Sequence, residues 1–132
     1  MEWKEAGIMK QKVSDYIADH IAEWGIRDVF TVTGGGAMHM NDAFGHHPKL
    51  HCTYQHHEQA CAMAAEAYAR MDNRMAAVCV TTGPGATNAI TGVLGGWMDS
   101  IPMLVFSGQA RYATTVPASG LPLRSMGVQE CN

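Results

Sequence analysis

The sequence lacks an excess of basic residues and any long apolar run. Nine Lys and Arg against twelve Asp and Glu leave a net charge of -3, which argues against nucleic acid and anionic membranes as partners. No stretch is long and apolar enough to span a bilayer, and the start of the chain has no apolar signal-peptide core. With 47% hydrophobic residues among 132, we expect one globular domain, cytoplasmic, with no nucleic acid and no membrane among its partners.

Cysteine is scarce as well, and its spacing excludes the common cysteine sites. The four cysteines form no CxxC pair, so we expect reduced, buried thiols. Zinc is the alternative, because a histidine cluster surrounds Cys52: His46, His47, His51, His56 and His57. Neighbouring side chains on a strand point to opposite faces, however, and no second ligand pair has zinc-finger spacing. We therefore predict no metal site on this chain.

Helical and strand patterns alternate along the chain. Apolar residues on one face predict a helix over 13–24, with Ser14 as N-cap and Gly25 at its end. Further helices are expected over 37–44, 58–71 and 86–97. Short apolar or β-branched runs predict strands over 28–32, 50–54, 75–82 and 101–108. This order predicts an α/β fold with an open, mainly parallel sheet and helices on both faces.

Glycines and prolines mark two exceptions to this regularity. Gly92, Gly95 and Gly96 interrupt the helix over 86–97 at about 1 kcal/mol each, so close backbone packing is expected there. Residues 109–132 have little periodicity, which predicts a loop-rich C-terminal tail. We expect residues 1–132 to form one domain whose tail continues into further domains absent from this sequence.

Polar or glycine-rich turns follow all four predicted strands: "TGGG", "QHHEQ", "TTGPGATN" and "SGQ". Ligands of parallel α/β sheets bind at this carboxyl edge. The turns miss both the GxGxxG spacing and the GK[ST] of a phosphate loop, which disfavours dinucleotides and nucleoside triphosphates. The pattern indicates a site for another small molecule.

Glu58 opens the alanine-rich helix over 58–71. An acid there has a structural explanation, because the helix dipole favours an anion in the first turn. The alternative is functional: a slim helix packed on the sheet brings Glu58 to the same edge as the "GPG" turn. A partly desolvated carboxylate at that edge can exchange a proton or a hydrogen bond with a ligand.

Three ordered motifs, "HHEQACAMAAEAYAR", "TTGPGATNAITGVLGGWMDSIPMLVFSGQ" and the terminal "GVQE", carry a family resemblance. Together they resemble the N-terminal, pyrimidine-binding domain of thiamine-diphosphate-dependent enzymes, closest to the acetolactate synthase-like branch. The resemblance runs from about residue 9 to residue 132. It implies the thiamine-diphosphate-binding fold, and it implies that thiamine diphosphate is the ligand.

The resemblance also implies roles for individual residues. Glu58 corresponds to the catalytic glutamate that hydrogen-bonds the cofactor's aminopyrimidine and promotes the tautomer that deprotonates the thiazolium carbon. Residues matching the pyrimidine pocket are Gly34, Gly35, Gly36, Thr82, Gly83, Pro84, Gly85 and Asn88. Substrate-pocket candidates are His57, Gln109 and Gln129. Val128 departs from the branch's "FQE" motif, which leaves substrate identity open.

The family's diphosphate and magnesium are held by a separate domain with a GDG motif that this chain lacks. The resemblance therefore implies half a site, inactive alone, in a homodimeric or tetrameric carboligase or decarboxylase acting on a small 2-oxo acid. Some acetolactate synthase relatives also bind FAD. Two alternatives stay open: a non-catalytic α/β interaction or regulatory module, with Met63, Trp97 and Met98 at an interface, or the separately encoded subunit of a two-subunit 2-oxo acid decarboxylase.

Overall fold

The computed structural model describes residues 10–120 of the chain. Strands and helices alternate as predicted, and most of the predicted boundaries are met within two residues. The elements are α1 (Val13–Glu23), β1 (Asp28–Thr31), η2 (Gly35–Ala37), α2 (Met38–His46), β2 (His51–Tyr54), α3 (Glu58–Asp72), β3 (Ala76–Val80), α4 (Pro84–Met98), β4 (Met103–Ser107), η3 (Tyr112–Thr114) and α5 (Val116–Ser119).

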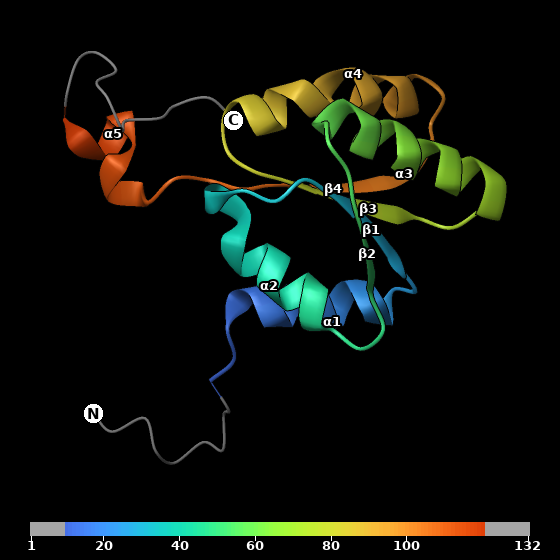
Figure 1. Cartoon of the computed structure of the whole chain (residues 1–132), viewed down its shortest axis with the longest axis horizontal. Coiled ribbons are helices and arrows are strands. Elements are labelled where there is room, and N and C mark those ends of the chain that lie inside the picture. Colours follow the sequence, from blue (N-terminus) through green and yellow to red (C-terminus); the bar gives the residue numbers. More distant parts are fainter. Residues whose placement is uncertain (1–9, 121–132) are drawn as a thin grey trace.

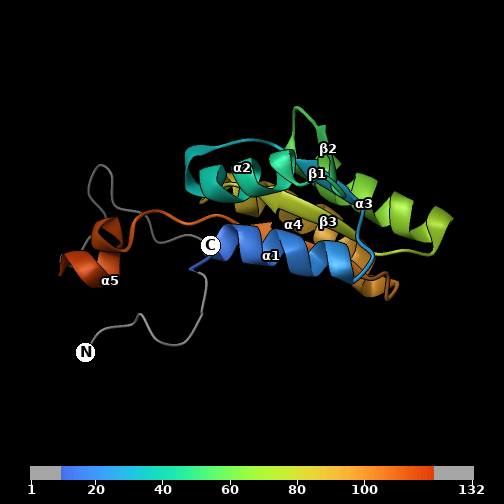
Figure 2. The same ribbon diagram turned by 90° about the horizontal axis from the view of Figure 1, so that it is seen from below.

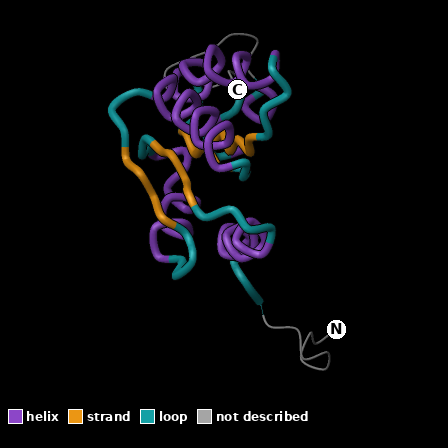
Figure 3. Tube along the Cα trace, turned by 90° about the vertical axis from the view of Figure 1, so that its right-hand side faces the viewer, coloured by secondary structure: helices purple, strands orange, loops and turns teal. Residues whose placement is uncertain are grey.

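The four strands form one parallel sheet in the order β2-β1-β3-β4. Helices α3 and α4 cover one face of this sheet, while α1 and α2 cover the other (Figure 1). The view from below separates α1 from α2 (Figure 2), and the tube from the side shows the strands between the two helical layers (Figure 3). The predicted α/β fold with helices on both faces is confirmed.

Strand β3 lies at the centre of the fold and is buried along its whole length. Its side chains alternate between two cores, as the pleat of a strand requires. Ala77 and Cys79 join the core beneath α1 and α2, whereas Val78 and Val80 join the core beneath α3 and α4. Burial on both faces explains why this strand is entirely apolar.

The ends of two helices differ from the prediction. Ser14 does not cap α1: the N-cap is Lys12, and Ser14 is 8% exposed inside the first turn. The prediction was wrong because the helix already begins at Val13, which leaves Ser14 inside the first turn on the buried face. Gly25 ends the helix as expected, with φ +87°. Helix α4 begins at Pro84, two residues early, because proline suits a first helical turn.

The segment after β4 is less regular than the rest of the chain, as predicted, although it contains two short helical turns, η3 and α5, that the sequence did not indicate. Both Figure 1 and Figure 2 show α5 apart from the sheet and its helical layers. Gln129 and Val128 lie outside the described residues, and the continuation of the tail into further domains stays a prediction. Within residues 10–120, no helix is long and apolar enough to cross a membrane.

Candidate functional site

The turns after β1 and β4 meet across the end of β3. The Gln109 N–H donates to the Gly36 carbonyl at 3.2 Å, and the Gly108 N–H donates to the Val80 carbonyl at 2.8 Å. A Cβ on Gly108 would lie 2.5 Å from the Gly36 oxygen, so only glycine permits this approach. The predicted "TGGG" and "SGQ" turns therefore share one edge of the sheet.

Thr81, directly after β3, joins these turns to the "GPG" turn. Its Oγ1 accepts a hydrogen bond from the Gly36 N–H at 3.0 Å. A Cβ on Gly34 would lie 2.4 Å from the Thr81 Cβ, and one on Gly85 would lie 2.7 Å from its Cγ2. Sequence reasoning missed Thr81, because nothing along the chain distinguishes it from Thr82. These glycines thus have a structural cause within the protein itself: they surround one threonine side chain.

The "GPG" turn starts α4 in a conformation that requires glycine. Gly83, the N-cap residue, has φ +63° and ψ -121°, a combination essentially restricted to glycine. Pro84 follows in the first turn of the helix, where its missing N–H costs nothing. The N-terminal end of α4 is thereby directed toward the same edge of the sheet.

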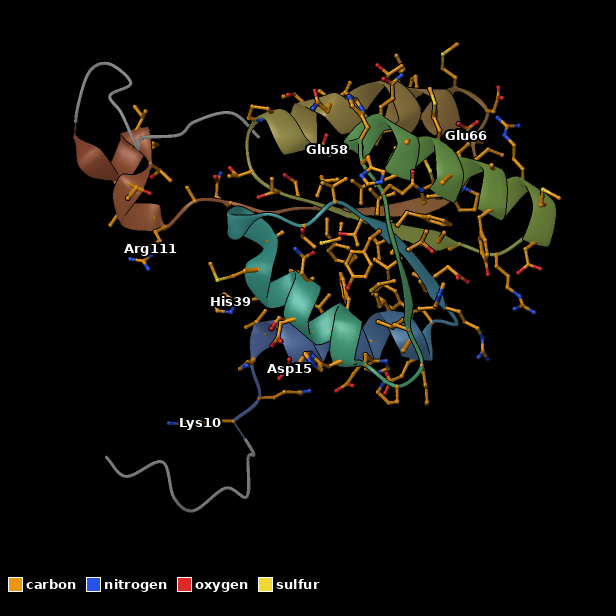
Figure 4. All side chains as sticks on the ribbon, viewed as in Figure 1. Lys10, Asp15, His39, Glu58, Glu66 and Arg111 are labelled. Atoms are coloured by element: carbon orange, nitrogen blue, oxygen red, sulfur yellow. The ribbon has the colours of Figure 1, made fainter. Side chains whose placement is uncertain are left out.

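Glu58 is the first residue of α3 and lies beside the N-terminal end of α4 (Figure 4). The preceding residue, His57, caps the helix: its Nδ1 accepts a hydrogen bond from the Gln59 N–H at 3.1 Å. The neutral His57 ring therefore carries its proton on Nε2. Glu58 itself is half-buried, and its carboxylate lies at the positive end of the helix dipole.

The two carboxylate oxygens of Glu58 have different surroundings. Oε2 accepts a hydrogen bond from Asn88 Nδ2 at 3.0 Å, the one hydrogen bond of this side chain within residues 10–120. Oε1 faces Gly85, 3.6 Å from the place where a Cβ would lie. One oxygen is held by Asn88, while the other lies beside Gly85.

The buried Cys61 lies one turn further along α3. Burial, together with the charge of Glu58, raises the pKa of the Cys61 thiol to about 11. Cys79 behaves alike, since burial raises its pKa to about 12. Both thiols stay protonated at neutral pH. The three cysteines within the described part of the chain are free, as predicted.

The other predicted residues divide into two groups. Thr82 and Gln109 are connected, because the Thr82 hydroxyl donates to Gln109 Oε1 at 3.1 Å and the Ala110 N–H donates to the same oxygen at 2.8 Å. Gly35 stands apart: an added Cβ would meet no atom of residues 10–120 within 4 Å. The protein therefore offers a packing reason for Gly34 and Gly36 but none for Gly35.

The clustered histidines are distributed over separate acidic partners. Three histidine nitrogens lie close to carboxylate oxygens: His46 to Asp42 at 3.2 Å, His47 to Asp19 at 3.2 Å and His51 to Asp28 at 3.3 Å. His51 is exposed at the strand edge while Cys52 packs against the core, so the two side chains do point apart. Among residues 10–120, no group of three or more His, Cys, Asp or Glu side chains is placed to hold a metal.

The arrangement around Glu58 fits a flat, polar heterocycle. A half-buried carboxylate at this edge can share a proton or a hydrogen bond with a ring nitrogen, and Gly35 has a Cβ position that no described residue obstructs. Two grooves elsewhere, one between α1 and α2 and one between α4 and β4, contain neither Glu58 nor the glycine turns.

Comparison with known proteins agrees with this geometry. The family model described as "Thiamine pyrophosphate enzyme, N-terminal TPP binding domain" matches residues 11–129. The acetolactate synthase large subunit of Lactococcus lactis is 36% identical over 96 residues, 73% of this chain and 17% of the relative. Acetolactate synthase isozyme 3 large subunit of Escherichia coli is 38% identical over 96 residues, with the same coverage.

A plant relative gives the same result. Acetolactate synthase 2, chloroplastic, of Zea mays is 37% identical over 99 residues, 75% of this chain and 16% of the relative. The match thus spans about one sixth of the length of these relatives. The thiamine-diphosphate-binding fold expected from the sequence is confirmed. The chain belongs to the thiamine pyrophosphate enzyme family and carries its N-terminal TPP-binding domain, in a form similar to that of acetolactate synthases.

Proposed function

We propose that this chain supplies the aminopyrimidine half of a thiamine diphosphate site in a carboligase that acts on a small 2-oxo acid such as pyruvate. The observation that carries the proposal is the position of Glu58: half-buried at the start of α3, with Oε2 bound to Asn88 and Oε1 facing Gly85. The similarity to acetolactate synthases supports the substrate class.

Thiamine diphosphate, when bound, supplies a carbon nucleophile that adds to the carbonyl of a 2-oxo acid. The proposed role of Glu58 is to share a proton or a hydrogen bond between its Oε1 atom and a nitrogen of the aminopyrimidine ring. An unprotonated ring nitrogen has a lone pair and no N–H, so its hydrogen bond to Oε1 requires a proton shared between the two atoms. Partial burial strengthens the interaction by limiting competition from water.

The neighbouring turns shape the space around the ring. Gly85 lies beside Oε1, and the Thr81 side chain packs against Gly34, Gly36 and Gly85. Gly35, which no protein atom crowds, is the glycine that we assign to close approach of the ring. His57 and Gln109 belong to the same edge, and we assign them to the substrate end of the site.

The second half of the site is part of the proposal. A domain of the same or a partner polypeptide would hold the diphosphate and its magnesium, since this chain matches the N-terminal domain of the family. Sharing of the site between subunits implies a homodimer or tetramer, and we place the enzyme in the cytoplasm. Decarboxylation of the 2-oxo acid precedes the joining step in this scheme. FAD, which the family resemblance allows for the full-length enzyme, is not part of the proposal.

A non-catalytic interaction module is the second candidate, and one observation favours it. Met63, Trp97 and Met98 are 45%, 75% and 70% exposed on the outer helical layer, which indicates an interface. An interface does not account for the Glu58–Asn88 hydrogen bond or for the glycine turns at the opposite end of the helices. A separately encoded subunit of a two-subunit decarboxylase would have the same half-site.

Substitution of Glu58 tests the proposal. In the complete natural protein, Glu58→Gln keeps the size and the hydrogen bonding of the side chain but cannot hold the proton. Turnover of pyruvate should fall by about 10²- to 10⁴-fold, the usual contribution of a positioned acid or base, with the melting temperature unchanged. Glu23→Gln, at the exposed end of α1, is the control. Equal turnover in Glu58→Gln and the parent would refute the assignment.

A further inference from the structure

Helices α3 and α4 run side by side in parallel, and the contacts between them keep a nearly constant sequence offset. The contacting pairs are Glu58 with Asn88, Ala62 with Gly92, Glu66 with Gly95, and Arg70 with Asp99. Members of the α3 set are four residues apart and therefore lie on one helical face. This row of four pairs, the α3–α4 seam, fixes which residue of α4 stands opposite Glu58.

Close contacts in the middle of the seam set the register of the two helices. A Cβ on Gly92 would lie 2.6 Å from the Ala62 Cβ and 2.9 Å from the Met63 backbone nitrogen. The far end is tied by Arg70, which donates hydrogen bonds to Glu66 on its own helix and to Asp99 at the end of α4. With the register set by the Ala62–Gly92 contact and by the Arg70–Asp99 hydrogen bond, Asn88 lies opposite Glu58 at the N-terminal end of the two helices.

Asn88 contacts the carboxylate through its amide group. Its Nδ2 donates to Glu58 Oε2 at 3.0 Å, and the side chain is otherwise exposed on the second turn of α4. A donor is required there, because an ionised carboxylate only accepts hydrogen bonds. His57, the polar residue next to Glu58 in sequence, uses its Nδ1 to cap α3.

We propose that Asn88 is a positioning residue: it holds Oε2 of Glu58 through the α3–α4 seam, so that Oε1 alone is presented to the cofactor ring. This inference rests on the function proposed above for Glu58. In this inference Asn88 does not contact the cofactor directly; it acts on the cofactor through the carboxylate of Glu58. A glutamate side chain has three rotatable bonds, and a hydrogen bond to one oxygen selects one orientation of the carboxylate.

The test uses the complete natural protein loaded with thiamine diphosphate and magnesium. The measured quantity is the rate at which deuterium replaces the proton on the thiazolium carbon between sulfur and nitrogen, read by NMR after acid quenching. The variants are Asn88→Ala, Asn88→Asp, Glu58→Gln and the double variant Asn88→Ala with Glu58→Gln. Thr91→Ala, an exposed change one turn along α4, is the control. Calorimetric cofactor affinity and melting temperature are recorded for each.

Asn88→Ala should slow the exchange by about 10- to 100-fold, the range for loss of a hydrogen bond to a charged group. Asn88→Asp, with the same shape but no donor toward the carboxylate, should slow it at least as much. Melting temperatures should not change. In the Glu58→Gln background, Asn88→Ala should have no further effect, because a residue that acts through Glu58 has nothing left to position.

Two results overturn the inference. One is an exchange rate in Asn88→Ala equal to that of the parent. The other is that Asn88→Ala slows the exchange as much in the Glu58→Gln background as in the parent and also weakens cofactor affinity. That result would mean that Asn88 contacts the cofactor directly. If Glu58→Gln itself leaves the exchange rate unchanged, the proposed function fails first, and the single variant of Glu58 identifies that case.

Discussion

Ala62 of α3 and Gly92 of α4 lie so close that a Cβ on Gly92 would be 2.6 Å from the Ala62 Cβ. Both residues are buried, above the core that β3 shares with these helices. The contact explains why α4 accepts glycines that cost helix stability, as expected from the sequence. It also places the start of α4 beside the start of α3, where Glu58 and Asn88 meet.

Gly92→Ala should therefore destabilise the protein, although alanine is the better helix former by about 1 kcal/mol. The new Cβ would meet the Met63 backbone nitrogen at 2.9 Å, and backbone cannot move aside as a flexible side chain can. We expect a net loss of about 1–3 kcal/mol, measured by urea denaturation. Thr91→Ala, the exposed neighbour, should show no loss. A stabilised Gly92→Ala variant would show that the helices are not in contact at this point.

Adjacent glycines of the "TGGG" turn should respond differently to alanine. Gly34→Ala places a Cβ 2.4 Å from that of Thr81 and should lower stability by about 1–3 kcal/mol. Gly35→Ala meets nothing within 4 Å and should leave the melting temperature unchanged. Under the proposed function it should still weaken thiamine diphosphate binding, measured by calorimetry. Equal melting temperatures for the two variants would contradict the packing of Thr81 against Gly34.

His57 caps helix α3, and this structural role can be tested separately from any role in the reaction. Since its Nδ1 accepts from the Gln59 N–H, His57→Ala should cost about 1 kcal/mol of unfolding free energy. His57→Asn restores an acceptor that suits the N-cap position and should recover that loss. If the asparagine variant is stable yet turns over pyruvate more slowly, His57 also serves the substrate. An alanine variant as stable as the parent would refute the cap.

The buried thiols predict a loss of stability at alkaline pH. The pKa of Cys79 is raised from 9.0 to about 12 and that of Cys61 from 9.0 to about 11, in both cases mainly by burial. Below pH 9.0 the thiols are protonated in both the folded and the unfolded state, so their contribution to the free energy of unfolding is fully present. Above it the unfolded thiols ionise first, so unfolding releases protons and stability falls as pH rises toward the folded pKa values.

Urea midpoints measured at about pH 8 and about pH 10.5 check this linkage. The midpoint should be lower at the higher pH, and Cys79→Ala should reduce the difference, because one of the two raised thiols is gone. Cys79 lies in the central strand, so the variant will be less stable at both pH values; only the difference between them is diagnostic. An unchanged difference in Cys79→Ala would contradict the assignment.

The local pattern of the sequence predicted the elements well, and the reasons are local. Alternating apolar runs, Gly25 with its positive φ and Glu58 in the first turn of α3 each depend on a few neighbouring residues. The Ser14 cap failed because tertiary burial decided which face of α1 turned inward. The role of Thr81 and the α3–α4 seam could not be predicted from local patterns. They depend on contacts between residues far apart in the sequence, such as Glu58 and Asn88, which are 30 residues apart.

The candidate site was predicted in outline for a comparable reason. Carboxyl ends of parallel strands must share an edge, which brought the "TGGG", "GPG" and "SGQ" turns together. The specific role of each glycine was beyond the sequence. Gly34 and Gly85 accommodate Thr81, whereas Gly83 satisfies a backbone conformation.

The central claim is that this chain forms the aminopyrimidine half of a thiamine diphosphate site around Glu58. Native mass spectrometry of the protein from its natural source tests it most directly. The account predicts that thiamine diphosphate and magnesium are retained, one cofactor for each copy of this sequence, and that Glu58→Gln lowers this retention. A protein that keeps no thiamine diphosphate, even with excess cofactor, magnesium and its natural partners present, would contradict the claim.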